Sequence, residues 1–254
     1  MVVEFEKQGR LAVITLNRPE ARNAVNGELA NALEAALDAY EADGELWAAI
    51  LTANGKAFCA GADLKAIAAG KGAELATKKG GFGGIVMRKR TKPLVAAVTG
   101  SALAGGTEIA LACDLIVCSE ETNFGLPEVK RSLVAAAGGL FRLPRAIGMA
   151  PALEVILTGD PLSAERAYQL GMINKVVPGD QVMDEARKLA ERIAANAPLA
   201  VQASRRVAMG AYADSDESLW KASFKEFQGL ASTEDYKEGP RAFIEKRAPK
   251  WQGK

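Results

Sequence analysis

Apolar and polar residues alternate at the start of the chain. Val3 and Phe5 form one short run, and Leu11, Val13 and Thr15 form a second. A polar turn of sequence Gln-Gly-Arg at residues 8–10 separates the two runs. Because a period of two places every second side chain on one face, the pattern predicts a β-hairpin with one buried face.

A helical period replaces the alternation after residue 26. Asn26 suits the cap of this helix, and Gly44 suits its end. Large apolar residues recur at three- to four-residue spacings along one stripe: Leu29, Leu33, Leu37 and Tyr40. The stripe predicts a helix that buries one face.

Further apolar strands alternate with predicted helices along the chain. Strands are expected at residues 47–51, 94–98, 114–119 and 172–177, and helices at 138–148, 151–158 and 163–171. This order predicts an α/β core with largely parallel strand pairing. From about Val182 the pattern is helical to the end. We therefore divide the chain into a core, residues 1–195, and a C-terminal helical region, residues 196–254, that packs on the core or on another subunit.

The segment from Gly70 to Gly84 is rich in glycine and poor in apolar residues. Such a composition is typical of a disordered surface loop. Long loops inside compact domains also form mobile walls of substrate pockets. The sequence leaves both interpretations open.

The segment from Leu94 to Asp114 contains the first candidate active-site residues. Its Gly105-Gly106 pair opens a predicted helix, where backbone N–H groups and the helix dipole favour negative charge. Glu108 lies in the first turn of that helix. A Gly/Pro turn after the next predicted strand delivers a second carboxylate, Glu128. Two carboxylates beside a backbone anion site form a candidate active site.

Composition restricts the chemistry further. The 254-residue chain contains no histidine, so Ser-His-Asp triads and most zinc sites are excluded and acid–base work falls to other side chains. We expect no metal. With 32 basic and 31 acidic residues, no strong field favours nucleic acid or an anionic membrane as a partner.

The three cysteines, Cys59, Cys113 and Cys118, are expected to be reduced thiols. Cys113 and Cys118 flank a predicted strand at odd spacing, which predicts that they point to opposite faces. Cys59 is expected to be a small buried residue. No targeting segment or membrane-spanning run is present at the N-terminus, so we expect a cytoplasmic protein.

The segment from Gly100 to Thr107 matches a phosphate-binding P-loop pattern except at one position. Gly106 stands where that pattern requires lysine, which supplies the main charge contact to the phosphates. We therefore do not expect nucleotide binding.

Three segments taken together resemble a known family: KAFCAGADL at residues 56–64, GGTE at 105–108 and FGLPE at 124–128. Shorter matches extend from LNRP at 16–19, through LTGD at 157–160, to AFIEKR at 242–247. Their order and spacing resemble the enoyl-CoA hydratase (crotonase) superfamily nearly end to end.

The resemblance implies a crotonase-like core of repeated ββα units forming two stacked sheets, with a C-terminal helical trimerisation region. It implies an acyl-CoA thioester as substrate, no cofactor beyond the CoA carried by the substrate, and assembly as a homotrimer or a dimer of trimers.

The resemblance also assigns roles to individual residues. The Ala62 and Gly105 N–H groups would bind the thioester oxygen as an oxyanion hole, which is the place where an enolate needs fixed donors. Glu108 and Glu128 would flank one water, and the Ala136 N–H would help to hold it. Lys246 of a neighbouring subunit would approach the CoA phosphates. The adenine end of CoA would lie along a short run: Ala60, Gly61, Ala62, Asp63, Leu64 and Lys65. Asp63 is also expected to cap the short helix that follows it.

Two glutamates favour hydration of an enoyl-CoA. The helix dipole favours ionised Glu108 as the group that activates water, and a drier setting for Glu128 would suit the proton donor. Other hypotheses stay open: the protein could catalyse enoyl-CoA isomerisation, thioester hydrolysis or dehalogenation, or it could bind acyl-CoA without catalysis. The FGLPEVKR and FRLPR segments also resemble the branch that includes crotonobetainyl-CoA hydratase.

Overall fold

The N-terminal hairpin is present as predicted. In the computed structural model, which describes residues 1–254, β1 (Val3–Gln8) pairs antiparallel with β2 (Leu11–Leu16), and Val3 lies opposite Leu16. Asn26 caps α1 (Gly27–Ala42) by accepting a hydrogen bond from the Leu29 N–H.

The hairpin begins a six-stranded sheet whose order is β1-β2-β3-β7-β9-β12. The four further strands of this sheet are β3 (Ala48–Ala53), β7 (Leu94–Val98), β9 (Leu115–Ser119) and β12 (Lys175–Val177). All pairs after the hairpin are parallel. The parallel α/β core predicted from the alternation of strands and helices is therefore confirmed.

A second sheet has the order β11-β10-β8-β4. Its strands are β4 (Ala57–Cys59), β8 (Ser101–Leu103), β10 (Asn123–Gly125) and β11 (Leu162–Ser163). Each repeating unit places its first strand in the large sheet and its second in the small one: β3 with β4, β7 with β8, and β9 with β10. This is the expected ββα repeat in two sheets.

The chain has ten α-helices. After α1 they are α2 (Leu64–Ala68), α3 (Gly105–Ala112), α4 (Gly139–Ile147), α5 (Met149–Thr158), α6 (Ala164–Gln169), α7 (Val182–Ala194), α8 (Pro198–Met209), α9 (Asp216–Ala231) and α10 (Glu234–Ile244). Short 3₁₀ turns are η1 (Pro19–Ala21), η2 (Gly72–Leu75), η3 (Pro127–Arg131) and η4 (Gly179–Gln181). No helix in this set combines the length and the apolar character needed to cross a membrane.

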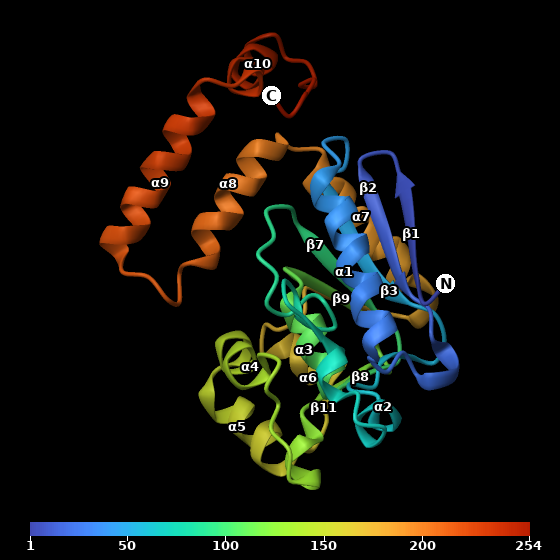
Figure 1. Cartoon of the computed structure of the whole chain (residues 1–254). Coiled ribbons are helices and arrows are strands. Elements are labelled where there is room, and N and C mark those ends of the chain that lie inside the picture. The colour runs from blue at the N-terminus through green and yellow to red at the C-terminus, as the bar shows by residue number, and fades with distance from the viewer.

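Both faces of the large sheet are buried, which explains why its central strands are apolar almost throughout. Ala49 and Leu51 point into the main core with α1, whereas Ala48 and Ile50 belong to a smaller core under α7. Figure 1 shows α1 and α7 on opposite sides of the sheet. Successive side chains of β3 point to opposite faces of the sheet, so one strand packs against α1 on one face and α7 on the other.

The cysteine prediction was wrong in one respect. Cys118 lies in β9, but Cys113 lies at the C-terminal cap of α3, outside the strand. Both pack in or against the main core. The alternation argument failed because it holds only within a strand.

The glycine-rich segment is ordered, so the disordered-loop interpretation was wrong. It forms η2 and a small hairpin of β5 (Ala76–Thr77) and β6 (Gly81–Phe82). Leu75 is buried in the main core. Gly84 needs to be glycine, because its φ is +72° and an added Cβ would lie 2.4 Å from the Ala30 carbonyl oxygen. The glycines therefore permit close packing against α1.

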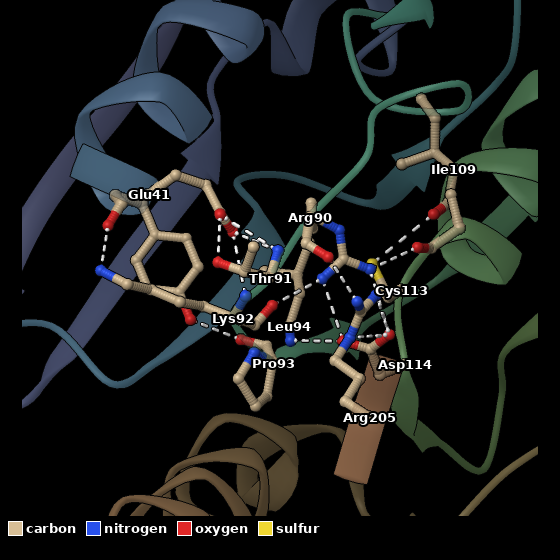
Figure 2. Close-up of polar contacts among 12 residues, drawn as sticks. Glu41, Arg90, Thr91, Lys92, Pro93, Leu94, Ile109, Cys113, Asp114 and Arg205 are labelled. Carbon is tan, nitrogen blue, oxygen red and sulfur yellow. Dashed lines mark hydrogen bonds and ion pairs between the residues drawn. The ribbon is translucent and has the colours of Figure 1, made fainter. Parts of the chain in front are cut away.

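The C-terminal helices extend away from the layered core, as Figure 1 shows in orange and red. Helix α8 is tied to the core by Arg205, which donates to Asp114 at 2.7 Å. Asp114 also receives hydrogen bonds from the buried Arg90 side chain at 2.9 Å and the Leu94 N–H at 2.8 Å (Figure 2). Burial raises the pKa of Asp114, but Arg90 and Arg205 outweigh it and hold the pKa below its ordinary value.

Candidate active site

Three parallel strands of the small sheet place the candidate residues together. β4, β8 and β10 are neighbours, and each runs in the same direction. The segments that follow them, which carry Ala62, Gly105 and Glu128, therefore emerge at one edge of the sheet. This is the edge where ligands bind in many parallel α/β proteins.

The first two of these segments touch through their backbones. Gly61 has a φ of +94°, and an added Cβ would lie 3.1 Å from the Gly105 nitrogen. An added Cβ at Gly105 would in turn lie 3.4 Å from the Gly61 Cα. Glycine at both positions lets two backbone segments approach more closely than any side chain would allow.

This contact leaves two backbone donors side by side. The Ala62 N–H donates to no other group of the protein. Gly105 opens α3, where the first N–H groups have no partner within the helix. Ala62 lies just before α2 and Gly105 opens α3, so this part of the site holds two backbone donors that can bind a negatively charged oxygen.

Thr107 fixes α3 against β10. Its hydroxyl lies 2.7 Å from the Ala102 carbonyl oxygen and accepts a hydrogen bond from the Gly125 N–H at 2.9 Å. The Ala104 N–H also donates to the Gly125 carbonyl oxygen at 2.8 Å. These bonds set the spacing between the helix that carries Glu108 and the strand that leads to Glu128.

Glu108 is only 3% exposed and points at the start of α4. Its Oε1 accepts a hydrogen bond from the Gly139 N–H at 2.9 Å. Burial raises the pKa of Glu108 above its ordinary value, and the charge of Glu128 adds to this, while the Gly139 and Ala137 N–H groups oppose it. A carboxylate with a raised pKa is a stronger base than an ordinary glutamate, which suits proton transfer.

Glu128 lies in η3 and is half-buried. Burial raises its pKa as well. Its Oε2 is buried and has no hydrogen-bond partner in the protein. The expectation that Glu128 has the drier setting of the two is wrong, because α4 covers Glu108 more completely. Glu128 instead differs in having an unpaired oxygen.

Both carboxylates line one cavity of ≈ 1470 Å³. Most of the other residues expected at the site line it too: Ala60, Ala62, Asp63, Leu64, Lys65, Gly105 and Ala136. Gly61 is buried behind this wall. Asp63 caps α2 as predicted, accepting from the Lys65 and Ala66 N–H groups, and it pairs with Arg18 at 3.2 Å.

The Ala136 N–H is engaged differently from the expectation, whereas the role of Lys246 stays a prediction because its expected contact is with the CoA of a neighbouring subunit. The Ala136 N–H donates to the Val134 carbonyl oxygen at 2.8 Å, so a water could share this donor only as a second acceptor. Lys246 is exposed in the turn after α10 and does not line the cavity of its own chain.

Two residues of the site, Gly139 and Arg142, were not expected from the sequence, and Gly139 supplies the hydrogen bond to Glu108. Phe82 belongs to the segment from Gly70 to Gly84, for which a pocket wall was one of the two interpretations left open, and its ring lies against Gly105 in the cavity wall. Arg142 lines the cavity and donates to the Val86 and Ala137 carbonyl oxygens at 2.6 and 3.3 Å. A signal for Arg142 lay in the FRLPR segment, whose basic residue breaks the apolar face of a helix.

Cys59 and Gly106 have structural roles. Cys59 is buried, as expected, and burial raises the pKa of its thiol to about 12. An added Cβ at Gly106 would lie 2.0 Å from the Cys59 carbonyl oxygen. This contact leaves no room for the lysine of a P-loop, and the α3 start is built for close backbone packing instead.

The fold and the site together define a protein with an α/β crotonase fold that sets two backbone donors and two carboxylates around one cavity. The family model described as enoyl-CoA hydratase/isomerase matches residues 6–254. The chain belongs to this enoyl-CoA hydratase/isomerase (crotonase) superfamily.

Individual relatives agree with this membership. The crystal structure of an enoyl-CoA hydratase from Mycobacterium tuberculosis H37Rv superposes with a TM-score of 0.96 at 46% identity, covering 100% of this chain and 99% of that one. A probable enoyl-CoA hydratase of Rhizobium meliloti is 41% identical over 95% of this chain and 94% of its own length. A carnitinyl-CoA dehydratase of Salmonella typhi is 39% identical, covering 99% of this chain and 98% of the relative.

Proposed function

We propose that this protein is an enoyl-CoA hydratase, which adds water reversibly across the 2,3 double bond of an enoyl-CoA thioester. The observation that carries the proposal is the presence of Glu108 and Glu128 in the one cavity that also holds the Ala62 and Gly105 donors. A single base would be enough for double-bond isomerisation, whereas hydration needs a base for water and an acid for the Cα carbon.

The oxyanion hole would act first on the thioester carbonyl. With its oxygen between the Ala62 and Gly105 N–H groups, the carbonyl draws electrons from the double bond and makes Cβ electrophilic. As water attacks Cβ, negative charge gathers on the thioester oxygen as an enolate. Donors that are already in place stabilise this charge without reorganisation.

The two carboxylates would divide the proton transfers. Glu108, oriented by the Gly139 N–H, takes the proton from water as oxygen bonds to Cβ. Protonated Glu128 delivers its proton to Cα, and the enolate electrons form the new C–H bond. The unpaired Oε2 of Glu128 supports this role, because it has no competing donor within the protein.

A panel of 2-enoyl-CoA substrates tests the reaction, read by loss of absorbance of the conjugated thioester. The roles are tested with a 3-hydroxyacyl-CoA in deuterated water. Glu128→Gln should abolish exchange of the Cα proton, whereas Glu108→Gln should keep some exchange while dehydration fails. Exchange that survives only in Glu128→Gln would mean that the roles are reversed.

Hydration of a crotonobetainyl-CoA is the second candidate. It is favoured by the carnitinyl-CoA dehydratases among the relatives and by a carnitinyl-CoA hydratase of Mycobacterium avium, 47% identical with a TM-score of 0.77. The chemistry at Cα and Cβ would be the same. Inclusion of crotonobetainyl-CoA in the panel separates the two substrates.

We also propose assembly as a homotrimer or a dimer of trimers through the C-terminal helices. Helix α9 has no buried residue in the single chain, and its large apolar side chains Trp220, Phe224 and Phe227 are exposed. Such a surface is typical of an interface. Lys246 of a second copy would then approach the CoA phosphates of the first.

A further inference from the structure

A second, smaller cavity lies directly behind Glu128. Its volume is ≈ 160 Å³, and all of its lining residues except Glu128 are hydrophobic. The walls come from η3 and the residue before it, from the loop before α4, from Leu140 in α4, and from α5, which packs against η3. Ile156 on α5 and Ala135 in the loop form buried parts of these walls.

This cavity adjoins the active-site cavity. Glu128, Leu133 and Val134 line both. Glu128, the proposed proton donor to Cα, therefore lies where the active-site cavity meets the small apolar cavity. An acyl group that places Cα beside Glu128 continues from Cβ as a hydrocarbon chain, and a hydrocarbon chain is stabilised by apolar surroundings.

We propose that the small cavity holds the hydrocarbon tail of the acyl group, and that the enzyme acts on medium-chain enoyl-CoA thioesters. This inference rests on the proposed hydratase function. In this proposal Ile156 and Ala135 determine which acyl chain length the enzyme prefers. Neither residue lines the active-site cavity, so each can change chain-length preference without touching the reacting carbons.

The volume sets the length of the tail. A dry protein cavity of about 150 Å³ accommodates one benzene molecule, which has six carbons. A tail of about four to six carbons beyond C4 would fill the space, which corresponds to octenoyl- and decenoyl-CoA. The outer rim is also apolar, since Val134 is 66% and Leu140 40% exposed. Each buried methylene should raise affinity about fourfold until the cavity is filled.

Ile156→Phe and Ile156→Ala test the proposal, because they fill and enlarge the cavity from a helix remote from the catalytic groups. Leu157→Phe is the matched control, since Leu157 is the next residue on α5 and is 69% exposed. The measurement is kcat/KM for 2-enoyl-CoA chains of about four, six, eight and ten carbons. Thermal unfolding of each variant checks that it is folded.

In the wild type and in Leu157→Phe, kcat/KM should rise from the four-carbon to the eight-carbon substrate. Ile156→Phe should lose on the order of tenfold or more with the eight-carbon substrate and less than about twofold with the four-carbon one. Ile156→Ala should shift the optimum to longer chains. Equal losses at every length, or no change at any length, in folded Ile156→Phe would overturn the proposal.

Binding separates this inference from the hydratase proposal. Butyryl-CoA and octanoyl-CoA cannot be hydrated, and their affinities are measured by calorimetry. If no substrate is hydrated but the preference for octanoyl-CoA is lost in Ile156→Phe, the hydratase proposal fails and the tail site stands. If crotonyl-CoA is hydrated but Ile156→Phe binds both thioesters as the wild type does, the tail site fails alone.

Discussion

Glu108 and Gly139 are joined by a hydrogen bond of 2.9 Å from the Gly139 N–H to the Glu108 Oε1. The bond fixes one carboxylate oxygen on the wall of the cavity. The glycine permits close packing here, because an added Cβ at Gly139 would lie 2.9 Å from the Leu126 Cδ1 and 3.2 Å from the Glu108 Cγ. Helix α4 thus positions a residue of α3.

The charges around Glu108 predict a pH dependence with a definite sign. Burial raises the pKa of Glu108, the charge of Glu128 raises it further, and Arg142 lowers it. Because the base must be ionised, kcat/KM should fall on the acid side at a pH above the ordinary glutamate pKa of about 4.3. In Arg142→Met this acid limb should move to higher pH, because a positive charge that favours ionised Glu108 is removed. An acid limb in folded Arg142→Met that coincides with the wild-type one would contradict this electrostatic account.

The oxyanion hole can be tested at Gly105 in a background that makes room for a side chain. An added Cβ at Gly105 would lie 2.4 Å from the Phe82 ring, so the test uses Phe82→Ala as its parent. Gly105→Pro in this parent removes the donor at a helix position that tolerates proline. It should lower kcat by about 100-fold or more. Gly105→Ala in the same parent keeps the N–H and serves as the control. Equal activity of the two folded double variants would rule out this donor.

The attachment of α8 to the core should depend on Asp114. Asp114→Asn removes the charge that balances buried Arg90 and should cost about 3–5 kcal/mol in the free energy of unfolding. Asp160→Asn is the control, because its pair with Lys130 is exposed and should contribute less than about 1 kcal/mol. Urea unfolding measures both. A similar small change in the two variants would contradict the assigned role.

The same aspartate predicts how stability changes in acid. The pKa of Asp114 is lower in the folded chain than in the unfolded one, so its contribution is fully present above the unfolded value of about 3.9. It is lost as pH falls from there through the folded pKa. Asp114→Asn should therefore flatten this part of the stability profile.

Assembly should depend on the apolar stripe of α9. Trp220→Ser combined with Phe224→Ser should shift sedimentation from a trimer or hexamer to smaller species, because both side chains are more than half exposed in the single chain. Lys221→Ser on the same helix is the control, since Lys221 pairs only with the exposed Glu217. A wild-type protein that sediments as a monomer would contradict the proposed assembly.

Much of the site could be predicted from the sequence, because the order of the parallel strands determines where the residues that follow them lie. Ala62, Gly105 and Glu128 each follow closely after a short strand, Glu108 lies in the first turn of the helix that Gly105 opens, and parallel neighbouring strands bring such positions to one edge. Ala62, Gly105, Glu108 and Glu128 therefore gather in one cavity as the resemblance implied. The roles proposed for them remain predictions.

The remaining features depend on contacts that no local pattern records. The Gly139 N–H donates to Glu108 across a sequence separation of 31 residues. In the sequence, Gly138 and Gly139 indicate only the start of a helix. The glycine-rich segment reads as flexible, yet Phe82 packs against Gly105 and Leu75 enters the core. The Ala136 N–H is engaged with Val134, which only the loop conformation could reveal.

The central claim is that Glu108 and Glu128 together add water across a 2,3-enoyl thioester. The most direct measurement is mass spectrometry of crotonyl-CoA after incubation in water labelled with oxygen-18. The wild type should yield a 3-hydroxyacyl-CoA that carries one labelled oxygen at C3, and Glu108→Gln and Glu128→Gln should each form it about 10²- to 10⁴-fold more slowly. Unaltered crotonyl-CoA, free CoA with a labelled acid, or undiminished hydration in either variant would contradict the claim.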